Sequence, residues 1–445
     1  MDILAKNGAI TRDQYANLAG KSGYAPRPAL ASQEDIQRQV KEQVDQEVKK
    51  QVAEATQDVP EITLKDKLQF ESKDGNFKWK IGGRIHTQAG VYNNSHTDDG
   101  ESTGFKSGAS IRRARLNVSA KLWKVWGLKL QYDFAGGSGT AGLRDAWIDY
   151  TNKEIWPFQA MVGQFKEYIS LESFGSSNDI TFIERALPTR AFMPPDARRL
   201  GFGLRTYGHD LWTLSTGVYG RNASGEDFGG VDIGSSNPMD FVGRVTVSPI
   251  HTDTEVVHLG FGGSYLSPDY DIRFRERPEM TPGTNRLVDT GLIEDVRGVT
   301  RLNAEVAGMY GPFSLQGEYW NVNLDRKGNA DATFDGWYLQ GSWIITGESR
   351  HYKWKDGTFH NPKPEGIVGD GGWGAWELGA RYSTLDLNSG AIHGGSEDNF
   401  TVGVNWYPTP IFKFMANYVK VLNVDGGQYA GASPDGFLFR GQVAW

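Results

Sequence analysis

Residues 77–92 read FKWKIGGRIHTQAGVY, and their side chains alternate between apolar and polar along much of the stretch. Because successive side chains of a β-strand point to opposite faces, this alternation predicts a strand with a different medium on each face. The apolar face carries Phe77, Trp79, Ile81, Ile85 and Val91, and the other face carries Lys78, Lys80, Arg84, His86 and Gln88. The stretch therefore predicts a strand that is apolar on one side and basic on the other.

The alternation recurs from residue 67 to the C-terminus. About 16 such strands fit into this part of the chain, roughly 24 residues for each strand with its loop, which is the spacing of an outer-membrane barrel. A soluble β-sandwich also alternates, but here aromatic residues stand at the ends of the apolar faces, and the chain ends on Trp445 in phase with Phe437 and Phe439. The sequence therefore predicts an all-β fold, a 16-stranded antiparallel transmembrane β-barrel over residues 67–445. Further examples of the pattern are RLNVSAKL at 115–122, WGLKLQYDF at 126–134, WYLQGSWI at 337–344, FTVGVNWY at 400–407 and FKFMANYV at 412–419.

The composition excludes several other classes of protein. The 445 residues include 56 Gly, 14 Trp, 18 Tyr and 22 Phe but no Cys, and the mean hydropathy is −0.49. No run of roughly 18 apolar residues is present, which excludes membrane-spanning helices. The lack of Cys excludes disulfide scaffolds, thiolate metal sites and Cys nucleophiles. The 8 His are scattered, with no catalytic or metal-ligand spacing, so we expect no enzyme, no cofactor and no metal site, with an outer-membrane hydrolase as the alternative.

Residues 1–60 have a different character. Positions 32–58 read SQEDIQRQVKEQVDQEVKKQVAEATQD, which predicts a helix with Ser32 as N-cap and a stop at Pro60. Since the narrow apolar stripe of this helix does not stabilise it alone, we expect residues 32–60 to form a periplasmic coiled coil, most simply a parallel trimer. A solvated linker helix is the alternative, and residues 1–31 are expected to be a short helical leader segment and linker. The stripe has a spacing of four and consists of Ile36, Val40, Val44, Val48 and Val52.

Basic residues are concentrated in the first part of the predicted barrel, although the whole chain has a formal net charge of −7. Between Ser102 and Tyr132 there are seven basic residues and no acid, and Arg113 and Arg115 share the polar face of their strand. Fixed cations on a lumen wall raise the local anion concentration and replace part of an anion's hydration. The sequence thus indicates an anion channel, with a lumen salt bridge or a solvated wall charge as the alternative role of each single residue.

The segment 166–200 is too long and irregular for a turn, and long loops in compact structures are usually functional. We interpret it as a loop that folds into the lumen and forms the constriction. The alternative is an extracellular loop whose arginines bind lipopolysaccharide phosphates. The candidate residues of its charged rim are Arg185, Arg190, Arg198 and Arg199.

Several motifs resemble the phosphate-selective porin O/P family, and the resemblance runs from about residue 75 to the C-terminus. It implies a homotrimeric outer-membrane channel of a Gram-negative bacterium for phosphate or polyphosphate, with the N-terminal segment in the periplasm. By this resemblance Arg84, Arg112, Arg113 and Arg185 fall on the central anion site, and Lys78 and Lys80 lie near its periplasmic approach. The motifs are Ile81-Gly82-Gly83-Arg84, Ile111-Arg112-Arg113-Ala114-Arg115-Leu116, Ile183-Glu184-Arg185-Ala186-Leu187, Val402-Gly403-Val404-Asn405-Trp406-Tyr407 and Ala416-Asn417-Tyr418-Val419-Lys420.

Two positions depart from the family pattern. Arg115 stands where members selective for orthophosphate tend to have an aromatic residue, and Arg144 precedes Asp145 where they have an acid. More charge at the narrowest point suggests a larger or more highly charged anion, so Arg115 joins the predicted constriction and Arg144 and Arg190 join the predicted basic lumen lining. Strict alternation also places Arg112 on the lipid face, so we expect a bulge or a strand end there.

Other functions are compatible with the same sequence. One is a general porin, or one for organic anions such as dicarboxylates and sugar phosphates. Another is a barrel that anchors a coil reaching peptidoglycan or a periplasmic partner, because 222–237 and 355–372 resemble long surface loops rich in acids. Lipids and lipopolysaccharide are the expected surroundings, and we expect no nucleic-acid partner.

Overall fold

The computed structural model describes the chain except for residues 1, 24–32, 56–59, 65–67, 136–141 and 153–155. The chain divides into two compact units, which comprise residues 1–60 and residues 61–445.

The first unit is helical. The helix expected from residue 32 onward is confirmed as α3, while its expected N-cap, Ser32, lies outside the described residues. Helix α2 begins after Thr11, whose hydroxyl accepts a hydrogen bond from the backbone N–H of Gln14, and ends at Gly23 in a left-handed conformation (φ 65°). In the described part of the chain, no helix has the length and apolarity that a membrane-spanning helix requires. The helices are α1 (Asp2–Lys6), α2 (Arg12–Ser22) and α3 (Gln33–Ala55).

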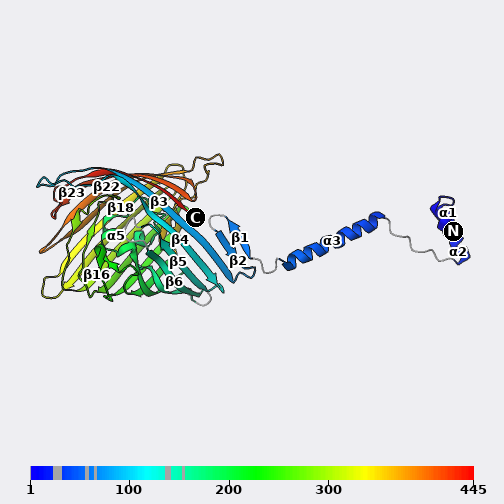
Figure 1. The fold of residues 1–445 in the computed structure, drawn as a ribbon, viewed down its shortest axis with the longest axis horizontal. Coiled ribbons are helices and arrows are strands. Elements are labelled where there is room, and N and C mark those ends of the chain that lie inside the picture. Colours follow the sequence, from blue (N-terminus) through cyan, green and yellow to red (C-terminus); the bar gives the residue numbers. More distant parts are fainter. Residues whose placement is uncertain (1, 24–32, 56–59, 65–67, 136–141, 153–155) are drawn as a thin grey trace. The chain divides into compact units, whose positions relative to one another are not determined.

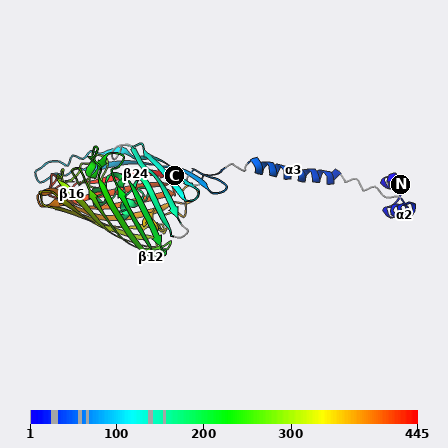
Figure 2. The same cartoon turned by 90° about the horizontal axis from the view of Figure 1, so that it is seen from below.

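The second unit contains a closed antiparallel β-barrel of 16 strands, whose tilted strands are visible in Figure 1 and Figure 2. The last strand pairs with the first from Asp435↔Asn93 to Ala444↔Arg84, which closes the sheet. The predicted all-β fold and its number of strands are therefore confirmed. The strands are β3 (Phe77–Asn93), β4 (Gly108–Leu122), β5 (Trp126–Asp133), β6 (Gly142–Asn152), β7 (Phe158–Lys166), β8 (Arg198–Gly208), β9 (Trp212–Tyr219), β12 (Met239–His251), β13 (Glu255–Ser267), β16 (Val296–Tyr310), β17 (Phe313–Arg326), β18 (Ala332–Ile344), β21 (Ala375–Ser389), β22 (Ile392–Thr409), β23 (Phe412–Asp425) and β24 (Asp435–Ala444).

Smaller elements complete the second unit. Strands β1 and β2 form a hairpin, and β2 also pairs with the start of β3. In the described parts of the connections between barrel strands lie three two-stranded hairpins and four short helices. These elements are β1 (Glu61–Leu64), β2 (Leu68–Glu71), β10 (Glu226–Asp227), β11 (Val231–Asp232), β14 (Arg275–Glu276), β15 (Val288–Asp289), β19 (His351–Lys353), β20 (Thr358–His360), α4 (Leu171–Phe174), α5 (Leu187–Ala191), η1 (Pro195–Ala197) and η2 (Phe228–Gly230).

The period-two pattern explains why these residues form a barrel. In β12, Phe241 and Val245 are exposed on the outside, whereas Asp240 and Arg244 are buried in the interior. An apolar outer face around a polar interior suits a barrel in an apolar medium. Closure also leaves no sheet edge, so the backbone groups of each strand pair with both neighbours.

The two ends of the barrel differ in their connections. At one end, which we call the short-turn end, most connections have two or three residues, as at 123–125, 252–254 and 311–312. The other end, which we call the long-loop end, carries the segments 94–107, 167–197, 220–238 and 268–295. A much longer connection at the short-turn end is segment 345–374, which carries the β19–β20 hairpin.

Two segments that we expected to be acidic surface loops fold partly inward instead. In segment 222–237, Asp227 is buried and pairs with Arg199 at 2.5 Å. In segment 355–372, Asp356 pairs with Arg205 at 3.0 Å. These acids serve as partners of lumen arginines, which corrects the prediction of exposed loops. The sequence did not reveal it because the paired residues are 28 and 151 positions apart.

An apolar cluster fills one side of the lumen. Phe192, next to α5, packs against Phe274 and Trp320, with ring centroids 5.5 and 6.4 Å away, and Phe228 packs on Phe274 at 5.5 Å. This cluster lies against β16, β17 and β18, which contribute Val299, Trp320 and Phe334 among others. On the other side of the lumen, residues of strands β3 to β8 line a cavity.

Candidate functional site

The connection between β7 and β8, residues 167–197, lies inside the barrel, where Figure 1 shows α5 behind the strands. Glu184 accepts two hydrogen bonds from Arg112, at 2.9 and 3.1 Å, and a third from Arg440 at 3.2 Å. The carbonyl of Thr181 accepts from the Asn405 amide at 2.8 Å. Because Arg112 lies on β4 while Asn405 and Arg440 lie on β22 and β24, the segment is fixed to several parts of the wall.

Two cavities adjoin this segment. A cavity of about 330 Å³ is lined by residues of β3 to β8 and by the β19–β20 hairpin. A second cavity of about 520 Å³ is lined by parts of segments 220–238 and 268–295. We call them the inner and the outer cavity. Arg185 and Asp196 are the described residues that line both cavities, so they mark the boundary between the two.

Arg112 and Arg113 both point into the barrel because β4 contains a bulge. His86 of β3 pairs with Arg113, and the next residue, Thr87, pairs with Ile111, which leaves Arg112 as the extra residue. Both arginines are buried while Ile111 is exposed on the outer face. The bulge that alternation required at Arg112 is therefore present.

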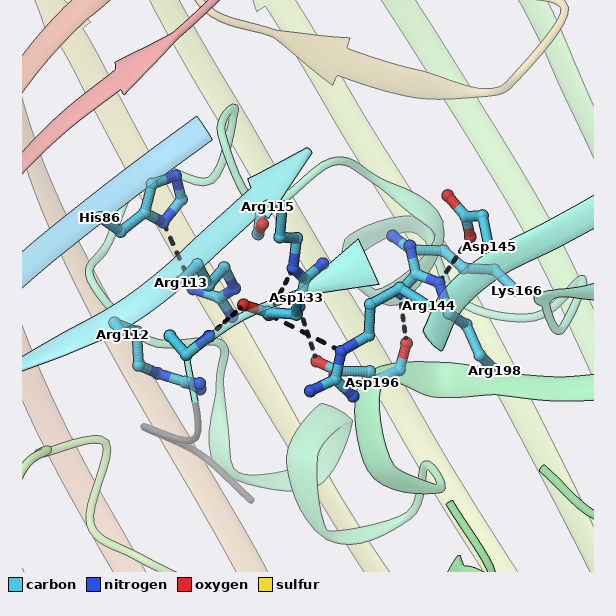
Figure 3. Close-up of polar contacts among 12 residues, drawn as sticks. His86, Arg112, Arg113, Arg115, Asp133, Arg144, Asp145, Lys166, Asp196 and Arg198 are labelled. Atoms are coloured by element: carbon cyan, nitrogen blue, oxygen red, sulfur yellow. Dashed lines mark hydrogen bonds and ion pairs between the residues drawn. The ribbon is translucent and has the colours of Figure 1, made fainter. Parts of the chain in front are cut away.

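Several of the predicted basic residues are held by carboxylates, as Figure 3 shows. Arg115 donates to Asp133 at 2.7 Å and contacts Asp196 at 3.4 Å. Arg144 forms ion pairs with the same two acids. The sequence suggested that the charges of Arg115 and Arg144 are available to an anion, but in the structure these two acids neutralise them. Other pairs are Arg198 and Lys129 with Asp145, each at 2.6 Å, Arg199 with Glu167 at 2.6 Å, and Arg190 with Glu276 at 3.4 Å.

Four cations of the inner cavity have no carboxylate within 4.0 Å among the residues that the structure describes: Arg84, Arg113, Lys166 and Arg185. Arg84 donates to the Ser177 hydroxyl at 2.9 Å, and the nearest polar contact of Arg113 is His86 Nδ1 at 3.5 Å. The Nε–H groups of both arginines are buried without an acceptor in the described part of the chain. A buried donor without a partner is costly, and an anion in the cavity would satisfy it.

The other two unpaired cations contact backbone carbonyls of residues 172–175. Lys166 Nζ donates to the carbonyls of Ser173, Phe174 and Gly175 at 2.8, 3.0 and 2.5 Å. Arg185 donates to those of Glu172 and Gly175 at 3.0 and 3.1 Å. A backbone carbonyl carries no net charge, so these contacts do not neutralise the two cations as a carboxylate would.

Burial and charge act together on the titratable groups of segment 167–197. Burial lowers the pKa of Arg185, and Glu172 offsets this shift only in part. Burial alone would raise the pKa of Asp196, but Arg115 and Arg144 hold it well below its ordinary value. Asp196 therefore stays ionised at the boundary of the cavities and neutralises part of their basic lining.

The structure sorts the predicted site residues into two groups. Arg84, Arg113 and Arg185 meet in the inner cavity without carboxylate partners, whereas Arg112, Arg115, Arg144 and Arg190 are paired. Lys78 pairs with Glu71 at 2.7 Å near the short-turn end, and Lys80, on the same strand, lines neither cavity. Lys166 was missed, although its position as the last residue before the long irregular segment was a usable signal. Among the described residues, no His, Asp and Glu side chains are grouped to hold a metal ion.

A closed 16-stranded barrel with an inward loop, one end of mostly short turns and an apolar outer face is the architecture of an outer-membrane porin. The family of phosphate-selective porin O and P matches residues 79–445, and the chain belongs to this family. The protein is accordingly an integral protein of the Gram-negative outer membrane, and its family membership implies a channel. The short-turn end then faces the periplasm, and the inner cavity lies on that side of the boundary.

Individual relatives agree with this assignment. Porin O of Pseudomonas aeruginosa is 27% identical over 430 residues, which cover 88% of this chain and 94% of the relative. An uncharacterised protein of Caulobacter vibrioides is 29% identical over 385 residues, covering 84% and 73%. Among solved structures, the anion-selective porin of Comamonas acidovorans has a TM-score of 0.53 at 12% identity, with 83% of this chain and 100% of that chain covered. The channel DcaP of Acinetobacter baumannii has a TM-score of 0.51 at 12% identity, with 84% and 99% covered. These structural likenesses concern the fold.

Proposed function

We propose that this porin is an anion-selective channel whose lumen binds phosphate or polyphosphate at the inner cavity. The observation that carries the proposal is the set of four basic residues there that have no carboxylate partner in the described chain. Arg84, Arg113 and Arg185 are guanidinium donors with unused hydrogen-bonding capacity, and the planar guanidinium fork suits phosphate oxygens. The hydrogen bonds to these guanidinium groups would replace part of the hydration free energy that an anion loses when it enters the cavity.

The outer cavity supports the same function. Its lining contains seven arginines and three acids. A basic vestibule concentrates anions, and several weak sites in series permit both entry and release. Arg185 would pass an anion from the outer to the inner cavity because it lines both.

The choice between phosphate and a larger anion changes in view of the ion pairs. Arg115 and Arg144 had suggested a more highly charged substrate, but Asp133 and Asp196 match their charge. The argument for a larger anion therefore loses its basis. The relative affinities of inorganic phosphate and polyphosphate follow from the bilayer measurement described below.

We also propose a homotrimer with α3 as its periplasmic coil. Ile36, Val40, Val44 and Val48 on one stripe of α3 are each between 49 and 53% exposed. Association of three helices would cover this stripe, which a single helix leaves in water. A trimeric coil would also offer a binding surface to peptidoglycan or a periplasmic protein. Outer-membrane lipid and lipopolysaccharide would surround the barrels.

The test is the reversal potential of the purified protein in a planar bilayer under a KCl gradient, repeated with phosphate and polyphosphate. We expect anion selectivity and a concentration-dependent block by these anions. Arg113→Ala and Arg185→Ala should each shift the selectivity toward cations. The matched control is Arg297→Ala, because Arg297 is exposed, pairs with Asp325 and lines neither cavity. Unchanged selectivity in both lumen variants would overturn the site, and a cation-selective wild type would overturn the function.

A further inference from the structure

One wall of the inner cavity is apolar, although the rest of the lining is polar and rich in basic residues. Following the barrel from β3 to β7, the inward side chains change from Arg84, Arg113 and Lys129 to Trp147 and Met161. Segment 167–197 adds aromatic rings to the apolar side. The apolar lining consists of Trp147, Met161, Phe165, Tyr168 and Phe174.

Trp147 is the part of this wall that is open to a ligand. It lies on β6 between two buried acids, Asp145 and Asp149, and is only partly buried at the edge of the apolar cluster. Its indole makes no hydrogen bond, ring contact or cation–π contact with any residue that the structure describes. Phe174, in contrast, already has the guanidinium groups of Arg205 and Arg244 at 5.2 and 5.7 Å from its ring centroid.

The part of the Trp147 indole that faces the water-filled lumen is unfavourable unless something covers it, because apolar surface in contact with water raises the free energy. A porin that passes only inorganic anions gains nothing from such a side chain. Trp147 therefore indicates a solute that has an apolar surface of its own.

The cationic groups lie beside the apolar wall. Lys166 donates to the carbonyl of Phe174 at 3.0 Å, and Arg185 donates to that of the next residue at 3.1 Å. Arg84 reaches Ser177 of the same segment at 2.9 Å. A solute that fills this cavity would meet cations at one end and the apolar wall at the other.

The size of the cavity fits an organic solute. Its volume of about 330 Å³ lies within the range of pockets that hold small organic molecules. An inorganic phosphate ion would leave most of the apolar wall in contact with water.

We propose that the inner cavity binds phosphate monoesters that carry a flat ring, with the phosphate at Arg84, Arg113 and Arg185 and the ring against Trp147. This inference rests on the proposed anion channel and names a substrate class for its inner site. The ring would cover the indole face while the phosphate satisfies the unpaired guanidinium donors.

The test compares phenyl phosphate with methyl phosphate as blockers of the chloride current through the wild-type protein. Both carry the same charge at pH 8 and differ in the ring. We expect phenyl phosphate to block at a concentration about tenfold lower, as one aromatic contact provides. Equal blocking concentrations in the wild type would overturn the proposal without any variant.

Trp147→Leu assigns the preference to one residue. We expect it to remove the advantage of phenyl phosphate while block by methyl phosphate and inorganic phosphate stays unchanged. The control is Trp126→Leu, whose indole lies on the exposed outer face of β5 and which should keep the preference. A wild-type preference that survives in Trp147→Leu would overturn the assignment.

The two proposals fail in different ways. An anion-selective pore that inorganic phosphate blocks, but that does not distinguish the two esters, overturns only this inference. A pore that is not anion-selective and that neither ester blocks overturns the proposed function as well.

Discussion

The two sides of the lumen use arginine differently. On the wall formed by β12 to β21, Arg244 donates to both oxygens of Glu305 at 2.8 and 2.7 Å, and Arg301 pairs with Glu167 at 2.9 Å and Asp240 at 2.5 Å. The wall formed by β3 to β7 also carries paired arginines, but its Arg84 and Arg113 have no carboxylate within 4.0 Å in the described chain. All four arginines point into the same barrel, so their direction does not distinguish their roles.

The difference teaches that the partner of a lumen arginine, rather than its presence, indicates its role. Arg301 also donates to the carbonyl of Phe192, so it holds segment 167–197 against the filled side of the barrel. Arg84 and Arg113 line an open cavity and keep unused donors. Paired arginines stabilise the inward segment, and the unpaired ones are available to a solute.

Removing Arg301 is expected to have the largest effect on stability. Arg301→Met leaves Asp240 buried without its cation, so the free energy of unfolding should fall by about 3–5 kcal/mol. The measurement is urea unfolding of the refolded barrel in lipid vesicles. Arg84→Met is the comparison and should change this free energy by less than about 1 kcal/mol, because no buried acid loses a partner. A similar loss in both variants would remove the distinction between paired and unpaired lumen arginines.

Glu184 sharpens the comparison because it connects segment 167–197 to Arg112 and Arg440. Burial alone would raise the pKa of Glu184, but Arg112 and Arg440 hold it well below its ordinary value. Glu184→Gln should lower the free energy of unfolding by about 2–3 kcal/mol at pH 7. A lowered pKa gives stability that is present above the ordinary pKa of about 4.3 and is lost as the pH falls through the folded-state pKa.

The difference between wild type and Glu184→Gln should therefore stay constant from pH 7 to pH 5. It should disappear only when the pH falls well below the ordinary glutamate value. Unfolding curves of both proteins across this range provide the measurement. A difference that already disappears above pH 5 would show that the carboxylate is not held by its arginines.

Asp196 tests whether pairing limits anion binding. Asp196→Asn removes the acid shared by Arg115 and Arg144 at the boundary of the two cavities. We expect phosphate to block at a concentration about tenfold lower, corresponding to about 1.4 kcal/mol of added attraction. The dose dependence of the block in a planar bilayer measures it. Weaker block in this variant would mean that the freed arginines do not face the solute.

The smallest effect is expected at an exposed pair. Arg297 and Asp325 are 2.5 Å apart, with side chains 60 and 49% exposed. Asp325→Ala should change the free energy of unfolding by about 0–1 kcal/mol, because water and salt screen the pair. The same urea experiment in vesicles provides the value. A loss as large as that of Arg301→Met would contradict the role that we assign to burial.

Local rules predicted much of the barrel. Period-two alternation gave the strands, and the failure of that alternation at Arg112 gave the bulge. The pairing of Arg115 with Asp133 was also within reach, because these two residues are direct cross-strand partners in β4 and β5.

Contacts between distant segments were not predictable. Asp196 meets Arg115 across 81 residues, and segment 345–374 meets segment 167–197 through Arg350 and Thr181, which are 169 residues apart. Such contacts depend on how two connections from opposite ends of the barrel fold inward. Neither periodicity nor local charge encodes that arrangement, so the sequence alone overestimated the number of free cations.

The bulge at Arg112 also determines which one-codon deletions β4 can accept. Loss of codon 112 would pair Arg113 and Ile111 with consecutive residues of β3 and leave both on their present faces. Loss of codon 111 would instead close the bulge by moving Arg112 into the outward position, against the acyl chains of the membrane. Two adjacent deletions of equal length would thus have opposite consequences. Aligned sequences of relatives should therefore tolerate a gap at position 112 but not at position 111.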